Sequence, residues 1–246
     1  CGGGTRFGGS AEIPLMADYL VGDSRSGMCF SEATIGLIPG WAGIARSLLK
    51  SGITNVAYMG KTAREVKAEP LRAIGIYNVV TAVPFPFPKR QKSDNPEADK
   101  AAYVQALEHH DQQTGMLLLP EGLALAVAPP AGIPVLDKDE RSTLAAKADI
   151  AEEVERRKNP DNYAHLWGKS VKEVKQEIAA LGKPLAPQSI EALEGLLAGV
   201  EPETLDEHQF VEKEMEADAR LYRDPRFRAG LIATLQQTIA DYREAQ

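Results

Sequence analysis

The first 83 residues alternate short apolar runs with glycine-rich turns. Two of the apolar runs cover residues 13–21 and 74–83. Runs of this length, separated by glycines, are typical of domains in which strands and helices alternate. The pattern therefore predicts an α/β core over residues 1–83.

The pattern changes sharply at residue 84. Three prolines lie within residues 84–88, and the positions up to 98 are basic or polar, which predicts an extended connector over 84–98. The apolar segment 115–136 that follows contains four prolines and Glu121. These prolines rule out an uninterrupted helix of about 20 residues, so we expect no membrane span. We assign residues 84–136 to a connector and an insertion.

From residue 137 the signal is mostly helical. Apolar residues recur at spacings of three and four, with charges between them, over 142–158, 170–181, 187–200 and 206–222, which predicts helices that each bury one face. Asp224 and Pro225 are typical of a helix start, and we expect that last helix to end near Arg243. Residues 137–246 thus form a largely helical C-terminal region.

The composition limits the partners and the compartment. The 246 residues carry 35 acidic and 28 basic side chains, a net charge of −7, so there is no excess of positive charge to bind nucleic acid. Cys1 and Cys29 cannot form a disulfide framework, and the first residues lack the basic-then-apolar order of a secretory signal. We therefore expect a cytoplasmic protein. The start at Cys1 predicts a processed, clipped or incomplete polypeptide.

The most informative stretch is the pair Gly8 and Gly9, which leads straight into an apolar helix-like run. Such a strand-to-helix turn lets a ligand approach the backbone, and its free amides suit a developing negative oxygen. Glu12 falls in the first turn of that helix. The alternative is a simple packing turn, because a carboxylate near a helix start is also favoured by the helix dipole.

A second carboxylate, Glu32, lies between an apolar strand-like segment and the Gly/Pro turn at 36–40. Burial there would raise its pKa. Two glutamates on turns suit proton transfer at a carbon next to a carbonyl, while main-chain amides hold the enolate oxygen. The sequence alone leaves open whether Glu12 and Glu32 meet.

These residues resemble a known family. The order Gly8-Gly9-Ser10-Ala11-Glu12, Asp18, Phe30-Ser31-Glu32, Gly36 and Ile38-Pro39-Gly40 is similar to that of the crotonase (enoyl-CoA hydratase/isomerase) superfamily. The resemblance covers residues 7 to about 83 and returns weakly over 212–235, where Glu-x-x-x-Asp precedes Asp-Pro-Arg-Phe-Arg-Ala-Gly. Ser10 departs from the family, which often has a third glycine there.

The resemblance implies an α/β, ClpP/crotonase-like core, of which this chain holds only the later half, and it implies a role for each matching residue. The Gly9 amide would be one of two oxyanion donors for a coenzyme A thioester, with Gly8, Gly40 and Trp41 also contacting the substrate. Glu12 would activate water, and Glu32 would exchange the proton at the α-carbon. Because both acids are present, the resemblance implies hydration of a 2-enoyl-CoA.

The resemblance also implies assembly and partners. Trimers or hexamers are expected, as is a companion chain that carries the front half of the fold and the other oxyanion donor. No metal or cofactor is expected beyond the coenzyme A of the acyl-CoA substrate. Two alternatives stay open: a crotonase-type hydrolase or isomerase acting on a cyclic or aromatic-derived acyl-CoA, and a non-catalytic assembly subunit.

Other candidate chemistry is disfavoured. Gly60-Lys61-Thr62 ends like a phosphate-binding loop, but Asn55 stands where that motif needs a glycine. Cys1 could be an amino-terminal nucleophile, although the glycines after it serve the turn equally well. No spacing of cysteines, histidines and acids suggests zinc. The basic stretch 89–92 is better explained as a solvated linker than as a phosphate contact.

Overall fold

The computed structural model describes residues 4–81, 93–106, 108–109 and 135–243. It divides into two compact units, one formed by Cys1–Val80 with Leu136–Gln246 and the other by Thr81–Val135. In the second unit, residues 96–106 and 108–109 are helical. Cys1, the prolines of the predicted connector, the basic stretch 89–92 and most of the apolar segment 115–136 lie outside the described residues.

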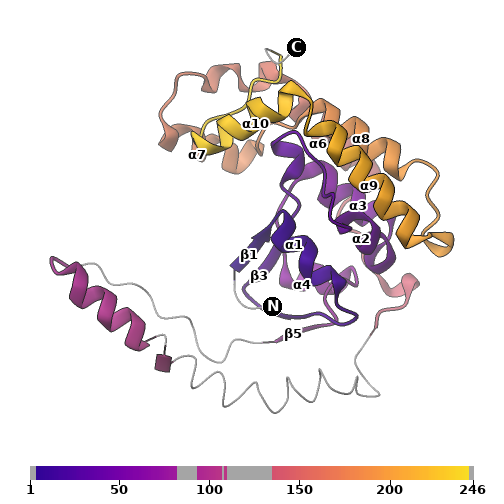
Figure 1. Cartoon of the computed structure of the whole chain (residues 1–246), viewed down its shortest axis with the longest axis horizontal. Helices are drawn as coiled ribbons and strands as arrows, with labels where there is room; N and C mark the ends of the chain where they lie inside the picture. Colours follow the sequence, from indigo (N-terminus) through magenta and orange to yellow (C-terminus); the bar gives the residue numbers. More distant parts are fainter. Residues whose placement is uncertain (1–3, 82–92, 107, 110–134, 244–246) are drawn as a thin grey trace. The chain divides into compact units, whose positions relative to one another are not determined.

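The first unit contains two small sheets (Figure 1). Strand β1 (Gly4–Phe7) pairs in parallel with β3 (Ser26–Cys29), which pairs antiparallel with β4 (Val66–Lys67). Strands β2 (Val21–Asp23) and β5 (Val79–Thr81) form a separate pair. The alternation predicted for the first 83 residues is thus seen as short strands and helices in turn.

Helices provide most of the remaining structure of the first unit. Those of the N-terminal segment are α1 (Gly9–Glu12), α2 (Gly43–Ser51), α3 (Ile53–Thr62) and α4 (Ala68–Ala73), with short 3₁₀ turns η1 (Ile13–Met16) and η2 (Glu32–Thr34). Those of the C-terminal segment are α6 (Lys147–Lys158), α7 (Val171–Leu181), α8 (Pro187–Leu197), α9 (Glu207–Leu221) and α10 (Pro225–Leu235), with 3₁₀ turns η3 (Lys138–Glu140), η4 (Pro160–Leu166) and η5 (Pro202–Thr204).

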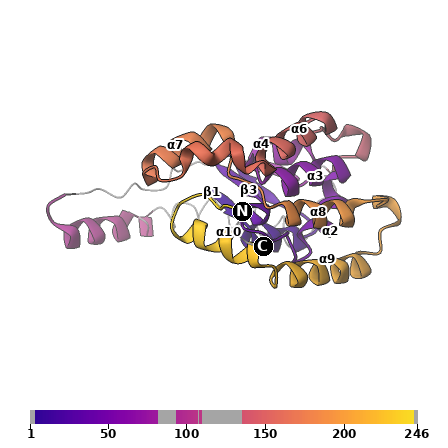
Figure 2. The ribbon, with the colours of Figure 1, turned by 90° about the horizontal axis from the view of Figure 1, so that it is seen from above.

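The C-terminal helices share a core with the N-terminal segment. Helix α9 packs against both α2 and α8, and α3 packs against α6 and α8, as Figure 2 shows from above. Fully buried side chains in this core include Ile44 and Leu48 of α2, Val56 of α3 and Leu193 of α8. The amphipathic faces predicted from the apolar spacing are therefore buried, those of α6, α8 and α9 in contact with the α/β part of the unit and that of α7 against other C-terminal residues.

Three predicted helix boundaries are wrong, and the smallest difference is in the helix predicted over 187–200, which ends at Leu197. The helix predicted over 142–158 begins at Lys147, because Asn55 bonds the carbonyl of Ser142 and the amide of Leu144 and so holds that backbone out of the helix. The last helix ends at Leu235 and not near Arg243.

The chain after the last helix turns back onto the core. Gln237 has a left-handed backbone with φ of 55°, which interrupts the helical path. The hydroxyl of Tyr242 then donates a hydrogen bond of 2.7 Å to the carbonyl of Thr34. None of the helices in the described part of the chain combines the length and the apolar character needed to cross a membrane.

Candidate active site

The parallel pairing of β1 and β3 brings two turns to one place. Phe7 pairs with Cys29 at the ends of the two strands, and the amide of Gly8 donates a hydrogen bond of 3.0 Å to the carbonyl of Cys29. Parallel strands end at the same edge of a sheet, where ligands commonly bind. The segments that carry Glu12 and Glu32 therefore leave the sheet side by side.

Helix α1 begins directly after β1. Gly8 has φ of 57°, a conformation that glycine adopts without a steric penalty. The Ser10 hydroxyl donates to the carbonyl of Phe7 at 2.7 Å, so the residue that departs from the family pattern stabilises the turn. Glu12, at the end of this turn, is 3% exposed. Its Oε2 accepts hydrogen bonds from the amides of Trp41 at 2.8 Å and Gly43 at 3.1 Å.

Glu32 begins the turn η2 and is 7% exposed. A Cβ atom added to Gly8 would lie 3.0 Å from Glu32 Oε1, so the glycine makes room for this carboxyl group. Among the described residues, none donates a hydrogen bond to Glu32 Oε2. A buried carboxyl oxygen without a donor favours the protonated form of the acid.

The two carboxyl groups have different proton affinities. Burial, with the charge of Glu12 as a smaller cause, raises the pKa of Glu32 to about 8. Burial also raises the pKa of Glu12, but the amides of Trp41 and Gly43 oppose that shift because they bind its anion. At neutral pH, Glu32 therefore holds a proton, and Glu12 is the member of the pair whose anion the backbone stabilises.

The remaining predicted residues are linked to this pair directly or through one neighbour: Trp41 bonds Glu12, Gly9 contacts Trp41, and Gly40 precedes Trp41. Gly9 is the first residue of α1, so its amide has no acceptor within the helix. A Cβ atom on Gly9 would lie 3.3 Å from the ring of Trp41, whose side chain is 61% exposed. The structure thus brings all six predicted residues into one cluster: Gly8, Gly9, Glu12, Glu32, Gly40 and Trp41.

Two acids from α9 join the cluster, and the sequence did not single them out. Glu214 accepts hydrogen bonds from the amides of Ile44 and Ala45, and Asp218 accepts one from Ile38. Burial raises the pKa of Glu214 to about 8 and also raises that of Asp218. The only signal for them was the weak family resemblance of the Glu-x-x-x-Asp spacing. No three acids, histidines or cysteines of the described residues are grouped as metal ligands would be.

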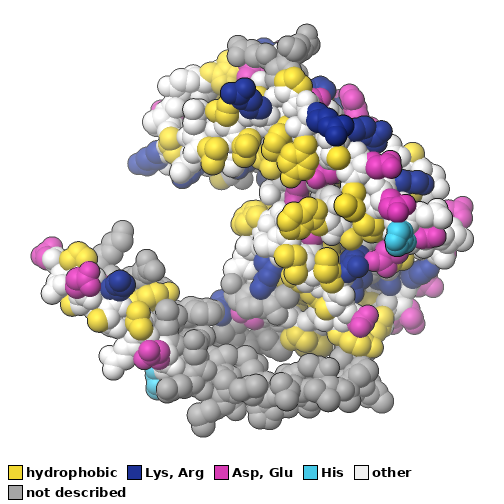
Figure 3. Space-filling view, in the orientation of Figure 1, with side chains coloured by type: hydrophobic (Ala, Val, Ile, Leu, Met, Phe, Trp, Pro, Cys, Tyr) yellow, Lys and Arg dark blue, Asp and Glu magenta, His cyan; other side chains and the backbone are white. Residues whose placement is uncertain are grey.

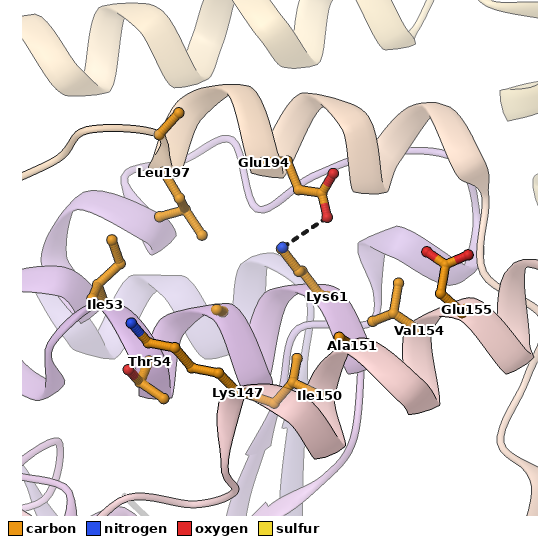
Figure 4. A pocket seen from close by; sticks show the side chains of 12 residues that line it. Ile53, Thr54, Lys61, Lys147, Ile150, Ala151, Val154, Glu155, Glu194 and Leu197 are labelled. Atoms are coloured by element: carbon orange, nitrogen blue, oxygen red, sulfur yellow. Dashed lines mark hydrogen bonds and ion pairs between the residues drawn. The ribbon is translucent and has the colours of Figure 1, made fainter.

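One cavity lies near the cluster, and another lies away from it. Ser31 and Thr34, on either side of Glu32, line a cavity of about 610 Å³ that also contacts α7, a volume within the range of small-molecule sites. A separate cavity of about 330 Å³ between α3, α6 and α8 is crossed by an ion pair of 2.9 Å between Lys61 and Glu194 (Figure 4). None of the six clustered residues lines either of these two cavities.

Comparison with known proteins gives matches in structure only. No protein-family model matches the chain, and no curated protein matches it. An enoyl-CoA hydratase from Rhodobacter sphaeroides 2.4.1 is similar in structure, with a TM-score of 0.51, 14% identity, and 99% of this chain and 63% of that chain covered. A carnitinyl-CoA dehydratase from Mycobacterium thermoresistibile matches with a TM-score of 0.50 and 13% identity, covering 98% and 61%.

The chain therefore spans less than two thirds of the length of these solved structures. The expectation that it holds only the later half of the core is not tested by these matches. The chain shares the overall fold of these two solved structures.

Proposed function

We propose that this chain contributes the catalytic site of an enzyme that hydrates a 2-enoyl-CoA thioester to a 3-hydroxyacyl-CoA. One observation carries the proposal: Glu12 and Glu32 form a buried pair of carboxyl groups at the turn where helix α1 begins with Gly9. Hydration needs a base for water, an acid for the α-carbon and a donor for the enolate oxygen, and these three groups supply them.

Glu12 is suited to the role of base. The amides of Trp41 and Gly43 bind its Oε2, which fixes the position of the carboxylate that would contact a water molecule. As water attacks the β-carbon, Glu12 takes one of its protons, and the new C–O bond forms while the carbon–carbon π bond breaks. The displaced electron pair moves to the thioester carbonyl and gives an enolate, whose oxygen the Gly9 amide stabilises.

Glu32 is suited to the role of acid. With its pKa raised to about 8 by burial, it is protonated at neutral pH. The enolate takes this proton at the α-carbon, and the thioester carbonyl re-forms. Glu12 has then gained one proton and Glu32 has lost one, so transfer of a proton between the neighbouring carboxyl groups restores the starting state. The balance is the addition of one water molecule.

The proposal includes a companion polypeptide that carries the front half of the fold. Several large apolar side chains near Glu12 are exposed, and grouped apolar side chains are visible in Figure 3. These exposed residues are Phe7, Ile13, Met16 and Trp41. Exposed apolar patches commonly mark contacts between proteins. A second oxyanion donor from that partner would contribute about 3 kcal/mol to transition-state stabilisation. Assembly into trimers or hexamers is part of the same proposal.

Product analysis by mass spectrometry tests the reaction. The chain, alone and with its co-purifying partners, is incubated with short and aromatic 2-enoyl-CoA substrates. Hydration gives a product heavier by one water with the thioester intact. Release of the free coenzyme A thiol would instead show a hydrolase, and a mass-neutral product with a moved double bond would show an isomerase. Failure of every acyl-CoA both to react and to raise the melting temperature would favour an assembly subunit.

A further inference from the structure

Helix α2 has no cap of its own. It begins at Gly43, and the preceding residue is Ala42, whose backbone is left-handed with φ of 66°. Alanine has no side-chain acceptor for the first amides of the helix, and uncapped amides in a buried helix start are costly. These amides therefore need acceptors from elsewhere in the chain.

Two carboxyl groups from distant elements supply these acceptors. Glu12 Oε2 binds the amide of Gly43 at 3.1 Å. Glu214 of α9 binds the amides of Ile44 at 3.0 Å and Ala45 at 3.1 Å, one with each carboxyl oxygen. Glu214 is fully buried, so its carboxyl group contacts the protein and not solvent. The start of α2 is thus held jointly by Glu12 and by α9.

Asp218 holds the other end of the same segment. It lies four residues after Glu214 and so on the same face of α9. Its Oδ1 accepts a hydrogen bond of 3.3 Å from the amide of Ile38. A Cβ atom on Gly40 would lie 2.7 Å from Asp218 Oδ2, so the aspartate fills the space beside that glycine. Helix α9 therefore binds residues 38–45 at both ends, through Asp218 and Glu214. Glu12 binds the amides between these two contacts.

We propose that Glu214 and Asp218 are positioning residues, which hold residues 38–45 so that the amides of Trp41 and Gly43 orient Glu12. The inference rests on the proposed function because it concerns the same site. It makes the C-terminal helix α9 a necessary part of the site, although 170 residues separate Glu214 from Ile44.

The charges of α9 also reach the two candidate catalytic acids. The charge of Asp218 raises the pKa of both Glu12 and Glu32. Asp218 also faces Tyr222, whose pKa its charge helps to raise, although burial is the larger cause. The pKa of Glu214 is in turn raised by the charge of Glu12 in α1 and lowered by that of Arg46 in α2. Removal of the Asp218 charge is therefore expected to lower the pKa of Glu32.

Amide hydrogen exchange on the whole chain tests the contact between Glu214 and the start of α2 without any assay of activity. Glu214→Gln keeps the size of the side chain but replaces one acceptor oxygen with an NH₂ group. One of the two main-chain amides then loses its hydrogen-bond acceptor. Exchange at whichever amide of Ile44 and Ala45 loses its acceptor is expected to accelerate by about tenfold or more. Glu216→Gln, an exposed residue on the same helix, is the matched control and should leave exchange unchanged. Equal protection in Glu214→Gln and the parent would overturn the proposal.

Asp218→Asn provides a second arm that does not depend on how Glu214→Gln folds. Asparagine retains an oxygen for the Ile38 amide and removes the charge. The titration midpoint of the Glu32 carboxyl, followed by carbon-13 NMR, is expected to fall below that of the parent, and the alkaline limb of the hydration rate should shift with it. Glu216→Gln should shift neither. An unchanged midpoint in Asp218→Asn would contradict the proposal, whereas a parent without hydratase activity would sink only the proposed function.

Discussion

Glu12 and Gly43 are in direct contact across 31 residues of sequence: the amide of Gly43 donates a hydrogen bond of 3.1 Å to Glu12 Oε2. A Cβ atom added to Gly43 would lie 2.5 Å from the same oxygen. Only a residue without a side chain lets this carboxylate approach the start of α2. Glu12, the candidate base, therefore also caps helix α2. Its position depends on Gly43, which lies outside the residues that resemble the family motif.

Gly43→Ala is expected to displace the Glu12 carboxylate. The added methyl group should cost roughly 1 to 3 kcal/mol of unfolding free energy and should lower the hydration rate. Gly195→Ala is the matched control, because a Cβ atom at Gly195 meets open space inside α8. There the same substitution should stabilise the protein by roughly 0.5 to 1 kcal/mol. Urea unfolding of both variants checks the pair, and a loss of stability in both would contradict the contact.

The buried acids give the stability a distinctive dependence on pH. Burial raises the pKa of Glu32 and of Glu214 from 4.5 to about 8, so the folded protein holds protons that the unfolded chain releases between these values. Their stabilising contribution is complete below the unfolded pKa and is lost as pH rises through the folded pKa. Each group should lower the unfolding free energy by up to about 1.4 kcal/mol per pH unit in that window.

Urea unfolding across this window checks the sign. The parent should become less stable as pH rises, Glu214→Gln should show a shallower slope, and the exposed control Glu216→Gln should follow the parent. Acids whose pKa is lowered, such as Glu153 with its arginine partners, titrate below this window and do not mask the effect. A parent whose stability rises toward pH 8 would show that the buried acids are ionised at little cost.

Arg157 ties the C-terminal helices to the α/β part of the unit. Its guanidinium is 1% exposed and donates to the carbonyls of Thr62 and Lys183 and to Glu153. Arg157→Met should cost roughly 2 to 4 kcal/mol, because two buried carbonyls lose their donors. Arg156→Met removes one bond to the carbonyl of Leu181 and should cost less than about 1 kcal/mol. Melting temperatures that fall equally would contradict this difference.

The motif-bearing turns could be predicted from sequence because their signals are local. The glycines before Glu12 and the Gly/Pro turn after Glu32 mark where strands end, and the parallel pairing of β1 and β3 then places both turns at one edge. The cap of α2 could not be predicted, because its acceptors lie in α1 and α9. Likewise, the apolar spacing over 142–146 fits a helix, but Asn55 binds that backbone in another conformation.

The rate of hydration in Glu12→Gln and Glu32→Gln tests the central claim most directly. With a short 2-enoyl-CoA, and with the Glu216→Gln variant as control, each of the two substitutions should lower kcat by about 100-fold or more, because each removes one proton-transfer group. Far-UV circular dichroism shows whether each variant keeps the parent fold. Hydration at the parent's rate by either folded variant would contradict the assignment of Glu12 and Glu32 as the base and the acid.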